Sequence, residues 1–419
     1  MTQVNEGDTA LLLAAGCVSM LMTPALGFFF GGLVRRKNIL HMIMQCIGIL
    51  LVTCVVWALL GYSLAFGSSK GHFIGGSDYF VLRNIDKTSP TYGPPTVSNG
   101  SFFFFQLSAC ALAPAIIVGS SAERFGLLPS LLFSCIWILI VYSPICHWMF
   151  HEDGWLKVLG TKDFAGGIVV HVSAGFSSIA LAIIIERRNP PKNSSDKHAA
   201  HNITYTLLGT ALLWFGWLGL NAGSAFSANG RASLAIASTN LAAASGCFGW
   251  ILIDYILNKK ISAIGIARGN ICGLVSISVG CGFCPTWSPF LIGFVGAVLS
   301  HLLVSFKEYN NLFDDALDVF ACHGIAGAWG AFAVGLVAND ESALGTSFTY
   351  GGFYGHGSLM GFQAVGVLTV GAYSFALSFI ILYIMKHLSI LRVTELDEEL
   401  GLDKRIYGEE AYIILQPSV

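Results

Sequence analysis

Two stretches of the chain decide its fold: DFAGGIVVHVSAG (residues 163–175) and DVFACHGIAG (residues 318–327). In each stretch an aspartate opens a run of apolar and small residues, and a histidine follows inside the run. His171 comes eight residues after Asp163, and His323 comes five residues after Asp318. Both histidines begin the pattern His-x-x-Ala-Gly. An ionisable side chain inside such an apolar run indicates a functional position in a membrane helix, because a polar group is expensive to bury there.

The composition extends this interpretation to all 419 residues. Hydrophobic residues make up 54% of the chain and charged residues only 11%, against about 25% charged residues in soluble domains. This excludes an ordinary soluble enzyme and predicts an all-α membrane protein. The net charge of −2 argues against a nucleic-acid partner. The 11 cysteines lie mostly inside apolar runs, so we expect no disulfide framework.

Eleven runs are long enough to cross the hydrocarbon of a lipid bilayer, which takes about 20 residues in a helix. The eleven predicted transmembrane helices span residues 9–33, 39–67, 101–121, 125–147, 166–186, 203–226, 232–257, 262–281, 287–306, 319–338 and 358–386. Residues 1–386 are therefore predicted to form a transmembrane domain and residues 387–419 a C-terminal tail. We expect this tail either to be solvated or to dock on the inner face of the bundle.

The lysines and arginines predict the orientation of the helices. With eleven spans the termini lie on opposite sides of the membrane, and one side holds 16 of the 22 Lys and Arg residues while the other holds 6. The positive-inside rule places the richer side in the cytoplasm. The sequence thus predicts an N-terminus outside and a C-terminus inside, in an integral protein of the plasma membrane.

The two stretches quoted first belong to the fifth and the tenth predicted helix, so these helices run in opposite directions. This spacing indicates a 5+5 inverted repeat with one helix left over, and such repeats place their functional centre near the bilayer midplane, between the halves. A single buried histidine is usually explained by a hydrogen bond to a backbone carbonyl. Because the motif occurs in both halves, we predict that His171 and His323 form that centre together.

Asp163 and Asp318 each open a helix, where a carboxylate accepts hydrogen bonds from free N–H groups and interacts favourably with the helix dipole. We predict this structural role for both. A general base or a metal ligand is the alternative, and Asp163, on the outer side, could also concentrate a cation.

Motifs for metal binding or catalysis are not found. A lone CxxC (residues 281–284) has no second pair or histidine at zinc-finger spacing, so no metal site is predicted. No phosphate-binding loop or metalloprotease motif is present. We therefore expect no cofactor and no enzymatic activity.

Several longer stretches resemble the ammonium transporter family, the Amt/Mep/Rh proteins. They are GFFFGGL (27–33), AER (122–124), DFAGGIVVH (163–171), WLGLNAGS (217–224), DVFACHG (318–324) and, in the tail, GLD (401–403) and GEEAY (408–412). The resemblance implies a homotrimer with one pore per subunit and ammonium and ammonia as ligands. It also implies that NH4+ loses its proton at an outer site, and that ammonia and the proton pass separately along a pore lined by His171 and His323.

The resemblance further implies which residues form the outer ammonium site beside Asp163. Ser224 matches the hydroxyl of the family's site and Phe105 matches one aromatic ring, but Phe150 stands where the family usually has a tryptophan. Phenylalanine is the weaker partner of a cation. Two phenylalanines that gate the pore of bacterial relatives are also missing, and Ala109 and Leu220 stand at those positions.

These three substitutions leave two functions open. One is a transporter with a different gate, for which Phe104 or Leu107 are candidates. The other is an ammonium sensor that binds the ion with little transport and signals through its cytoplasmic tail to a partner protein. Both functions share one fold, and a fold alone does not determine function.

Overall fold

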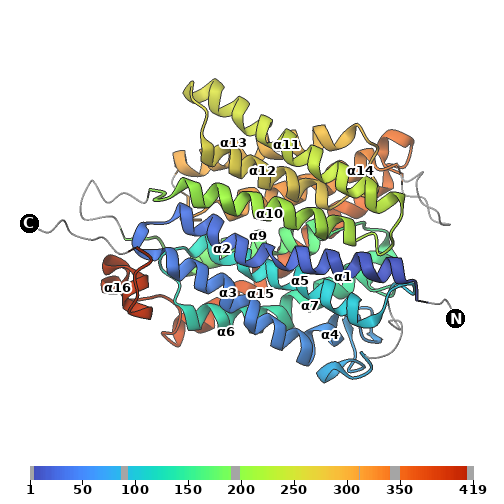
Figure 1. Ribbon diagram of the computed structural model, residues 1–419, viewed down its shortest axis with the longest axis horizontal. Helices are drawn as coiled ribbons and strands as arrows, with labels where there is room; N and C mark the ends of the chain where they lie inside the picture. Colours follow the sequence, from blue (N-terminus) through green and yellow to red (C-terminus); the bar gives the residue numbers. More distant parts are fainter. Residues whose placement is uncertain (1–3, 86–92, 190–198, 311, 340–349, 413–419) are drawn as a thin grey trace, which may run out of the picture.

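Long helices lie roughly side by side in this protein (Figure 1), in a computed structural model that describes residues 4–85, 93–189, 199–310, 312–339 and 350–412. The α-helices are α1 (Glu6–Met20), α2 (Met22–Leu33), α3 (Ile39–Val56), α4 (Tyr62–Phe66), α5 (Asn99–Ile117), α6 (Leu127–Trp137), α7 (Ser143–Phe150), α8 (Trp155–Leu159), α9 (Ser173–Ile185), α10 (Ile203–Gly223), α11 (Gly230–Asn258), α12 (Ala263–Ser278), α13 (Ser288–Asn310), α14 (Ala326–Val337), α15 (Ser358–His387) and α16 (Glu395–Leu400). Two short strands, β1 (Ser69–Lys70) and β2 (Ile74–Gly75), form an antiparallel hairpin. The predicted all-α membrane fold is confirmed.

Among the described residues, ten helical segments are long and apolar enough to cross a membrane. They are Glu6–Leu33, Arg36–Phe66, Asn99–Ser121, Leu127–Leu159, Gly167–Ile185, Ile203–Gly223, Gly230–Asn258, Ser288–Asn310, Phe320–Val337 and Ser358–His387. Several join an α-helix to a π-helical turn, and the turns η6 (Gly167–Val172) and η7 (Phe320–Ile325) contain the two histidines of the repeated motif. Each of the ten matches one of the eleven predicted spans.

The remaining predicted span, residues 262–281, corresponds to α12, which is apolar but has only 16 residues. Its length of about 24 Å at 1.5 Å per residue is less than a hydrocarbon thickness of about 30 Å. Its C-terminal carbonyls bond to another segment: Ser278 accepts a hydrogen bond from the N–H of Ala165, and Val279 accepts one from the N–H of Phe164, both at 2.9 Å. The end of α12 is therefore tied to the segment that leads into η6.

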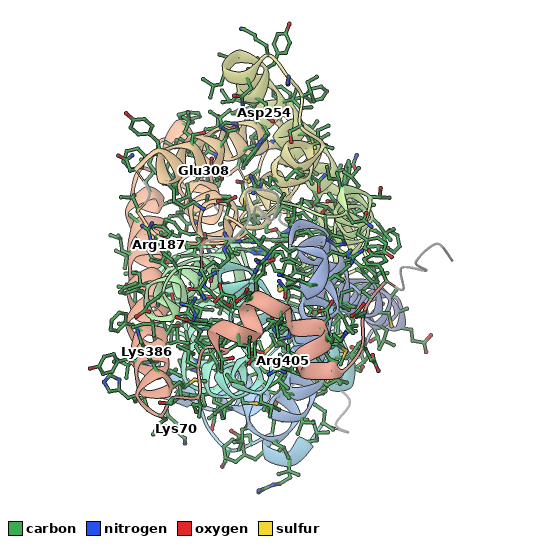
Figure 2. All side chains as sticks on the ribbon, turned by 90° about the vertical axis from the view of Figure 1, so that its left-hand side faces the viewer. Lys70, Arg187, Asp254, Glu308, Lys386 and Arg405 are labelled. Carbon is green, nitrogen blue, oxygen red and sulfur yellow. The ribbon has the colours of Figure 1, made fainter. Side chains whose placement is uncertain are left out.

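The start of α1 and the short helix α16 lie at opposite ends of the bundle (Figure 1), as an odd number of crossings requires. Figure 2 views the end that carries α16, where Arg187, Lys386 and Arg405 are found. Ion pairs gather at this end, including Arg35 with Glu123 at 2.9 Å and Arg188 with Asp314 at 2.8 Å. The basic side predicted from the sequence is thus the end of the bundle that carries α16.

The part of the tail that the structure describes, up to Tyr412, docks on this end, as one of the two expectations had it. Asp403 accepts hydrogen bonds from the N–H groups of Leu40 and His41, at 3.0 and 2.8 Å, and so caps the first turn of α3. Glu398 is 1% exposed and accepts hydrogen bonds from the N–H of Asn189 and from Arg392, both at 2.7 Å. Residues far apart in the sequence therefore complete each other's hydrogen bonds here.

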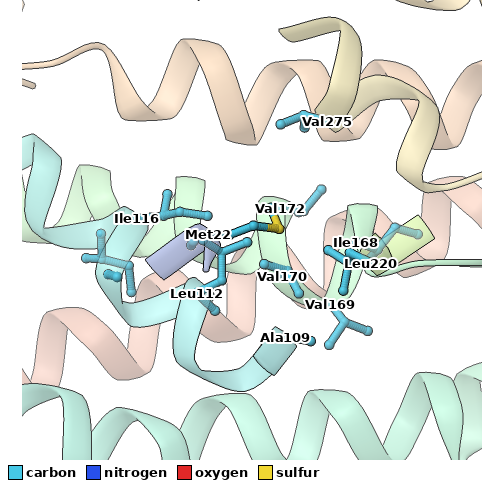
Figure 3. Packing of buried hydrophobic residues seen from close by; sticks show 14 of the residues in the cluster. Met22, Ala109, Leu112, Ile116, Ile168, Val169, Val170, Val172, Leu220 and Val275 are labelled. Carbon is cyan, nitrogen blue, oxygen red and sulfur yellow. The ribbon is translucent and has the colours of Figure 1, made fainter. Parts of the chain in front are cut away.

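Buried apolar side chains fill the middle of the bundle (Figure 3). Met22 of α2, Leu112 of α5, Val170 of η6 and Val275 of α12 are all at most 1% exposed. An ion without partners is strongly destabilised among such side chains, whereas a small neutral molecule is not. The interior therefore separates the two ends of the protein by an apolar barrier.

Candidate functional site

The imidazole rings of His171 and His323 meet in the interior of the bundle. Their Nδ1 atoms lie 3.2 Å apart, within hydrogen-bond distance, and the rings stack with centroids 5.2 Å apart. The side chains are 0% and 4% exposed. Two neutral imidazoles can form this hydrogen bond when the Nδ1–H of one ring donates to the bare Nδ1 of the other.

Trp217 of α10 holds the pair from one side. Its ring stacks on that of His171, with centroids 4.9 Å apart and an interplanar angle of 16°. Its indole N–H donates to Ser278 Oγ at 2.7 Å, which fixes the orientation of the ring. Within the described residues the second ring nitrogen of His171, Nε2, has no hydrogen-bond partner, so this atom is available to accept or donate a proton.

Small residues after each histidine let the two helices touch. A Cβ atom on Gly175 would overlap the backbone of Gly324, and one on Gly327 would lie 2.8 Å from the carbonyl oxygen of Gly167. Residue 167 thus faces residue 327, while residue 175 faces residue 324, so the two segments run antiparallel. This is the arrangement that the inverted repeat predicts for its central helices.

Asp163 caps the turn that carries His171. Its carboxylate accepts hydrogen bonds from the N–H groups of Gly166 at 3.0 Å, Ile168 at 2.8 Å and Val169 at 2.9 Å. Gly166 has φ +94°, a left-handed conformation that glycine adopts without strain. The predicted capping role of Asp163 is confirmed.

The prediction that Asp318 caps the other turn is wrong. The N–H of Phe320, at the start of η7, donates instead to Asp315 at 2.8 Å. Asp318 itself is 3% exposed and forms ion pairs with Arg268 of α12, at 2.5 Å, and with Lys307 of α13. Asp318 therefore pairs by charge with two neighbouring helices instead of capping η7.

A cavity of about 360 Å³ opens at the end of the bundle opposite α16. We call it the aromatic cavity, because seven phenylalanines line it: Phe66, Phe102, Phe105, Phe150, Phe164, Phe226 and Phe283. All six residues assigned to the ammonium site and the gate lie on its wall: Phe105, Ala109, Phe150, Asp163, Leu220 and Ser224. Val170, the residue before His171, lies on it as well.

Phe104 and Leu107, the candidates for a replacement gate, do not line the aromatic cavity. The ring of Phe104 lies against Gly16 of α1, where an added Cβ atom would be only 2.8 Å from it. Leu107 is 5% exposed. Neither of these two side chains therefore closes the aromatic cavity towards the histidines.

Four charged residues of the aromatic cavity were not predicted from the sequence. Glu152, Lys157, Lys162 and Arg231 line it beside Asp163. Three of them lie in a segment between predicted spans, where a charged residue is ordinarily solvated. The stacking of Trp217 on His171 was not predicted either, although Trp217 begins one of the stretches that carry the family resemblance.

Known proteins resemble this chain over nearly its whole length. Residues 10–412 match the profile described as Ammonium Transporter Family. A protein named ammonium transporter from Bacillus subtilis (strain 168) is 39% identical over 409 residues, which cover 98% of this chain and 99% of that protein.

Solved structures extend the similarity to the fold. The crystal structure of Candida albicans Mep2 has a TM-score of 0.88 at 31% identity and covers 94% of this chain and 88% of its own. A structure described as a sensor Amt protein has a TM-score of 0.87 at 30% identity and covers 96% and 98%. Sequence and structure therefore agree over nearly the whole length, and the chain belongs to the ammonium transporter family.

Proposed function

We propose that this protein moves ammonium across a membrane by separating it into ammonia and a proton. NH4+ binds in the aromatic cavity, gives up its proton there, and the two products pass the His171–His323 pair and leave at the end that carries α16. The observation that carries this proposal is the coincidence of two features. The six residues assigned to the ammonium site and the gate line one cavity, and its wall reaches Val170, next to the paired histidines.

The physical chemistry of the two species supports the separation. The interior between the aromatic cavity and the opposite end is apolar, and transferring NH4+ intact into it would forfeit the hydration of a full charge. Neutral ammonia loses far less. A hydrogen-bonded imidazole pair can accept a proton at one nitrogen and release one at another, so it offers a route for the proton without a free ion.

The binding site follows from the residues around the cavity. The rings of Phe105 and Phe150 attract a cation through their π faces. The hydroxyl oxygen of Ser224 and the negative charge of Asp163 add to this attraction. Since Asp163 uses its oxygens to hold backbone N–H groups, we infer that it acts on the ion by its charge and does not bind it directly.

The orientation and assembly belong to the same proposal. We infer eleven transmembrane helices with the aromatic cavity outside and α16 in the cytoplasm, because Lys and Arg are divided 16 to 6 between the two sides. Residues 1–386 then form the transmembrane domain and residues 387–419 the cytoplasmic tail. We further infer a homotrimer in the plasma membrane, as the family resemblance implies.

The test is uptake of ¹⁴C-methylammonium by proteoliposomes that contain the purified protein. We expect saturable uptake for the wild type and its loss in His171→Ala and His323→Ala. His356→Ala is a matched control, because this histidine is exposed at the surface. Uptake that survives in both pore variants would refute the proposed route.

A sensor is the second candidate function. Ala109 and Leu220 at the gate, Phe150 in place of tryptophan, and the similarity to a structure described as a sensor Amt protein favour it. In that case ammonium binding would be relayed through the docked tail to a cytoplasmic signalling partner. Saturable binding by calorimetry, without uptake in the same preparation, would establish the sensor and exclude the transporter.

A further inference from the structure

Two lysines lie on the wall of the aromatic cavity, in which the proposed ligand is itself a cation. Lys157 belongs to α8, and Lys162 follows three residues after its end. The backbone of Lys162 is held in place by Gln363 of α15, whose side chain accepts from the N–H of Lys162 at 2.7 Å and donates to its carbonyl at 2.9 Å. Lys157 is exposed where it lines the cavity, and Lys162 is partly buried there.

The side-chain ammonium group of Lys157 forms a hydrogen bond with a residue of the proposed binding site. Its Nζ donates a hydrogen bond to the carbonyl oxygen of Phe150 at 3.2 Å. An aromatic ring of the same cavity also holds a cation of the chain, since the guanidinium of Arg231 lies 5.8 Å from the ring centroid of Phe283. The cavity thus binds positively charged groups of its own chain at a carbonyl and at a ring.

A positively charged side chain on the wall of the cavity repels a cation inside it. Two unit charges a few ångströms apart interact appreciably even in water, and more strongly beside low-dielectric walls. Glu152 and Asp163 on the same wall act in the opposite direction. The balance of these charges should therefore determine how much ammonium is needed to fill the cavity.

We propose that Lys157 and Lys162 are affinity-determining residues of the aromatic cavity. Their positive charges weaken the binding of ammonium and raise the concentration at which the site is half occupied. This inference rests on the proposed function, because it assumes that the cavity is the ammonium site. It adds that the site is adjusted for high ammonium concentrations by cations that belong to the chain.

The test compares KM and the maximal rate of methylammonium uptake in single variants. Lys157→Met and Lys162→Met should each lower KM about two- to five-fold, with a smaller change in the maximal rate. Lys157→Arg keeps the charge and should stay within about two-fold of the wild type. Glu152→Gln removes a negative charge from the same wall and should raise KM by a similar factor.

A matched control is Lys260→Met, which removes a charge from an exposed lysine between α11 and α12. Its KM should equal that of the wild type. If Lys157→Met and Lys162→Met also have the KM of the wild type, the inference is overturned. If these variants lose uptake and also no longer elute as a folded trimer in size-exclusion chromatography, ammonium binding is measured on Lys157→Gln instead. An affinity of Lys157→Gln equal to that of the wild type would overturn the inference as well.

Ionic strength provides a second measurement. The Debye length falls from about 30 Å at 0.01 M to about 8 Å at 0.15 M, so added salt screens the repulsion. With N-methylglucamine chloride, whose cation is much larger than ammonium, salt should lower the KM of the wild type more than that of the Lys157→Met/Lys162→Met double variant. Equal salt effects in both proteins would contradict the role of the two lysines.

The failures of the two proposals can be distinguished. If the wild type shows neither saturable uptake nor saturable binding, the proposed function itself fails. Suppose that the wild type binds ammonium, that the lysine variants bind it with the same affinity, and that salt affects both proteins equally. Then only the proposed role of the lysines fails. The binding measurement can also be made if the protein is a sensor, because it determines ammonium affinity without requiring transport.

Discussion

The segments around Asp163 and Asp318 carry the same motif at opposite ends of the protein, but their carboxylates do different things. Asp163 accepts hydrogen bonds from three backbone N–H groups at the start of η6. Asp318 forms ion pairs with Arg268 and Lys307, and another residue, Asp315, accepts the hydrogen bond from the first turn of η7. The histidines that follow them, eight residues after Asp163 and five residues after Asp318, nevertheless meet in the same hydrogen bond.

This difference shows how one repeated motif can serve two tasks. Within the part of the chain that the structure describes, no lysine or arginine forms an ion pair with Asp163, and this residue lies on the wall of the aromatic cavity. Its negative charge is thus directed towards a cavity that we propose for a cation. The charge of Asp318 is neutralised by two basic side chains and connects α12 and α13 to the tenth span.

The largest effect should come from removing the carboxylate of Asp163. Asp163→Ala leaves three buried backbone N–H groups without an acceptor, and each such group costs about 1–3 kcal/mol. We expect a loss of about 3–5 kcal/mol in the free energy of unfolding and no measurable methylammonium uptake. The thermal midpoint in detergent and uptake by proteoliposomes measure the two effects.

Asp163→Asn separates the two roles of the side chain. The amide oxygen can still accept N–H bonds but carries no charge, so stability should recover in part while ammonium affinity stays low. Asp153→Ala is the control, because that aspartate is exposed in the preceding loop. Full uptake in Asp163→Asn would mean that the charge is dispensable and that only capping matters.

The sequence predicted the shared part of the two segments better than their differences. The histidine pair could be predicted because its motif occurs twice, with the helix directions set by the number of spans. The partners of Asp318 could not, since Arg268 and Lys307 come from α12 and α13 and only packing brings them together. Local spacing also could not decide whether Asp315 or Asp318 caps η7, because both precede its first residues and backbone geometry selects between them.

The residues of the aromatic cavity also fall into those that could be predicted from the sequence and those that could not. Family motifs predicted six of its wall residues, because these lie in long transmembrane helices or beside them. Lys157 and Lys162 were missed, since only the folding of the segment 155–163 over the end of the bundle places them on the wall. The shortness of α12 was also missed, because its apolar run continues beyond the point where Phe164 and Ala165 bind its last carbonyls.

The next effect in size concerns the ion pairs of Asp318. Asp318→Asn leaves the charges of Arg268 and Lys307 without their partner, and breaking a fully buried ion pair costs about 3–5 kcal/mol. The two cations are 22% and 14% exposed, so we expect a smaller loss of about 2–4 kcal/mol in the free energy of unfolding. Uptake per folded molecule should change much less than in Asp163→Asn.

Arg268→Gln in the background of Asp318→Asn tests whether the loss comes from the unpaired charge. If it does, the double variant should be more stable than the sum of the two single losses predicts. Additive losses in thermal unfolding would contradict this explanation. Equal loss of uptake per folded molecule in Asp318→Asn and Asp163→Asn would remove the functional difference between the two segments.

A smaller effect, which depends on pH, is expected at Asp314, four residues before Asp318. Burial alone would raise the pKa of this carboxyl group, but the hydrogen bonds from Arg188 and the charges of Arg124 and Arg188 outweigh burial and hold the pKa well below its usual range. A pKa that is lowered on folding contributes stability above the ordinary pKa of about 4, and this stability is lost as the pH falls. We therefore expect Asp314→Asn to lower stability by about 1.5–3 kcal/mol at pH 7, and the difference from the wild type to shrink below about pH 4. A difference independent of pH between 7 and 3 would show that the carboxylate charge is not responsible.

The smallest effect is expected at Phe150, which lines the aromatic cavity together with Asp163. It tests whether this cavity binds a cation. Phe150→Trp enlarges a π face on the wall that Asp163 also lines, and tryptophan attracts a cation more strongly than phenylalanine, so ammonium should bind more tightly by about 0.5–2 kcal/mol. Phe150→Leu removes the ring and should weaken binding by a comparable amount. Isothermal calorimetry measures the ammonium affinity of both variants. Both substitutions change the volume of the cavity, but only Phe150→Trp increases the attraction to the ring. Affinity changes of opposite sign therefore indicate attraction to the ring and not an effect of volume. If both variants bind as the wild type does, the ring of Phe150 does not face the ion, and the attraction at this end depends on Asp163 and the remaining rings of the cavity.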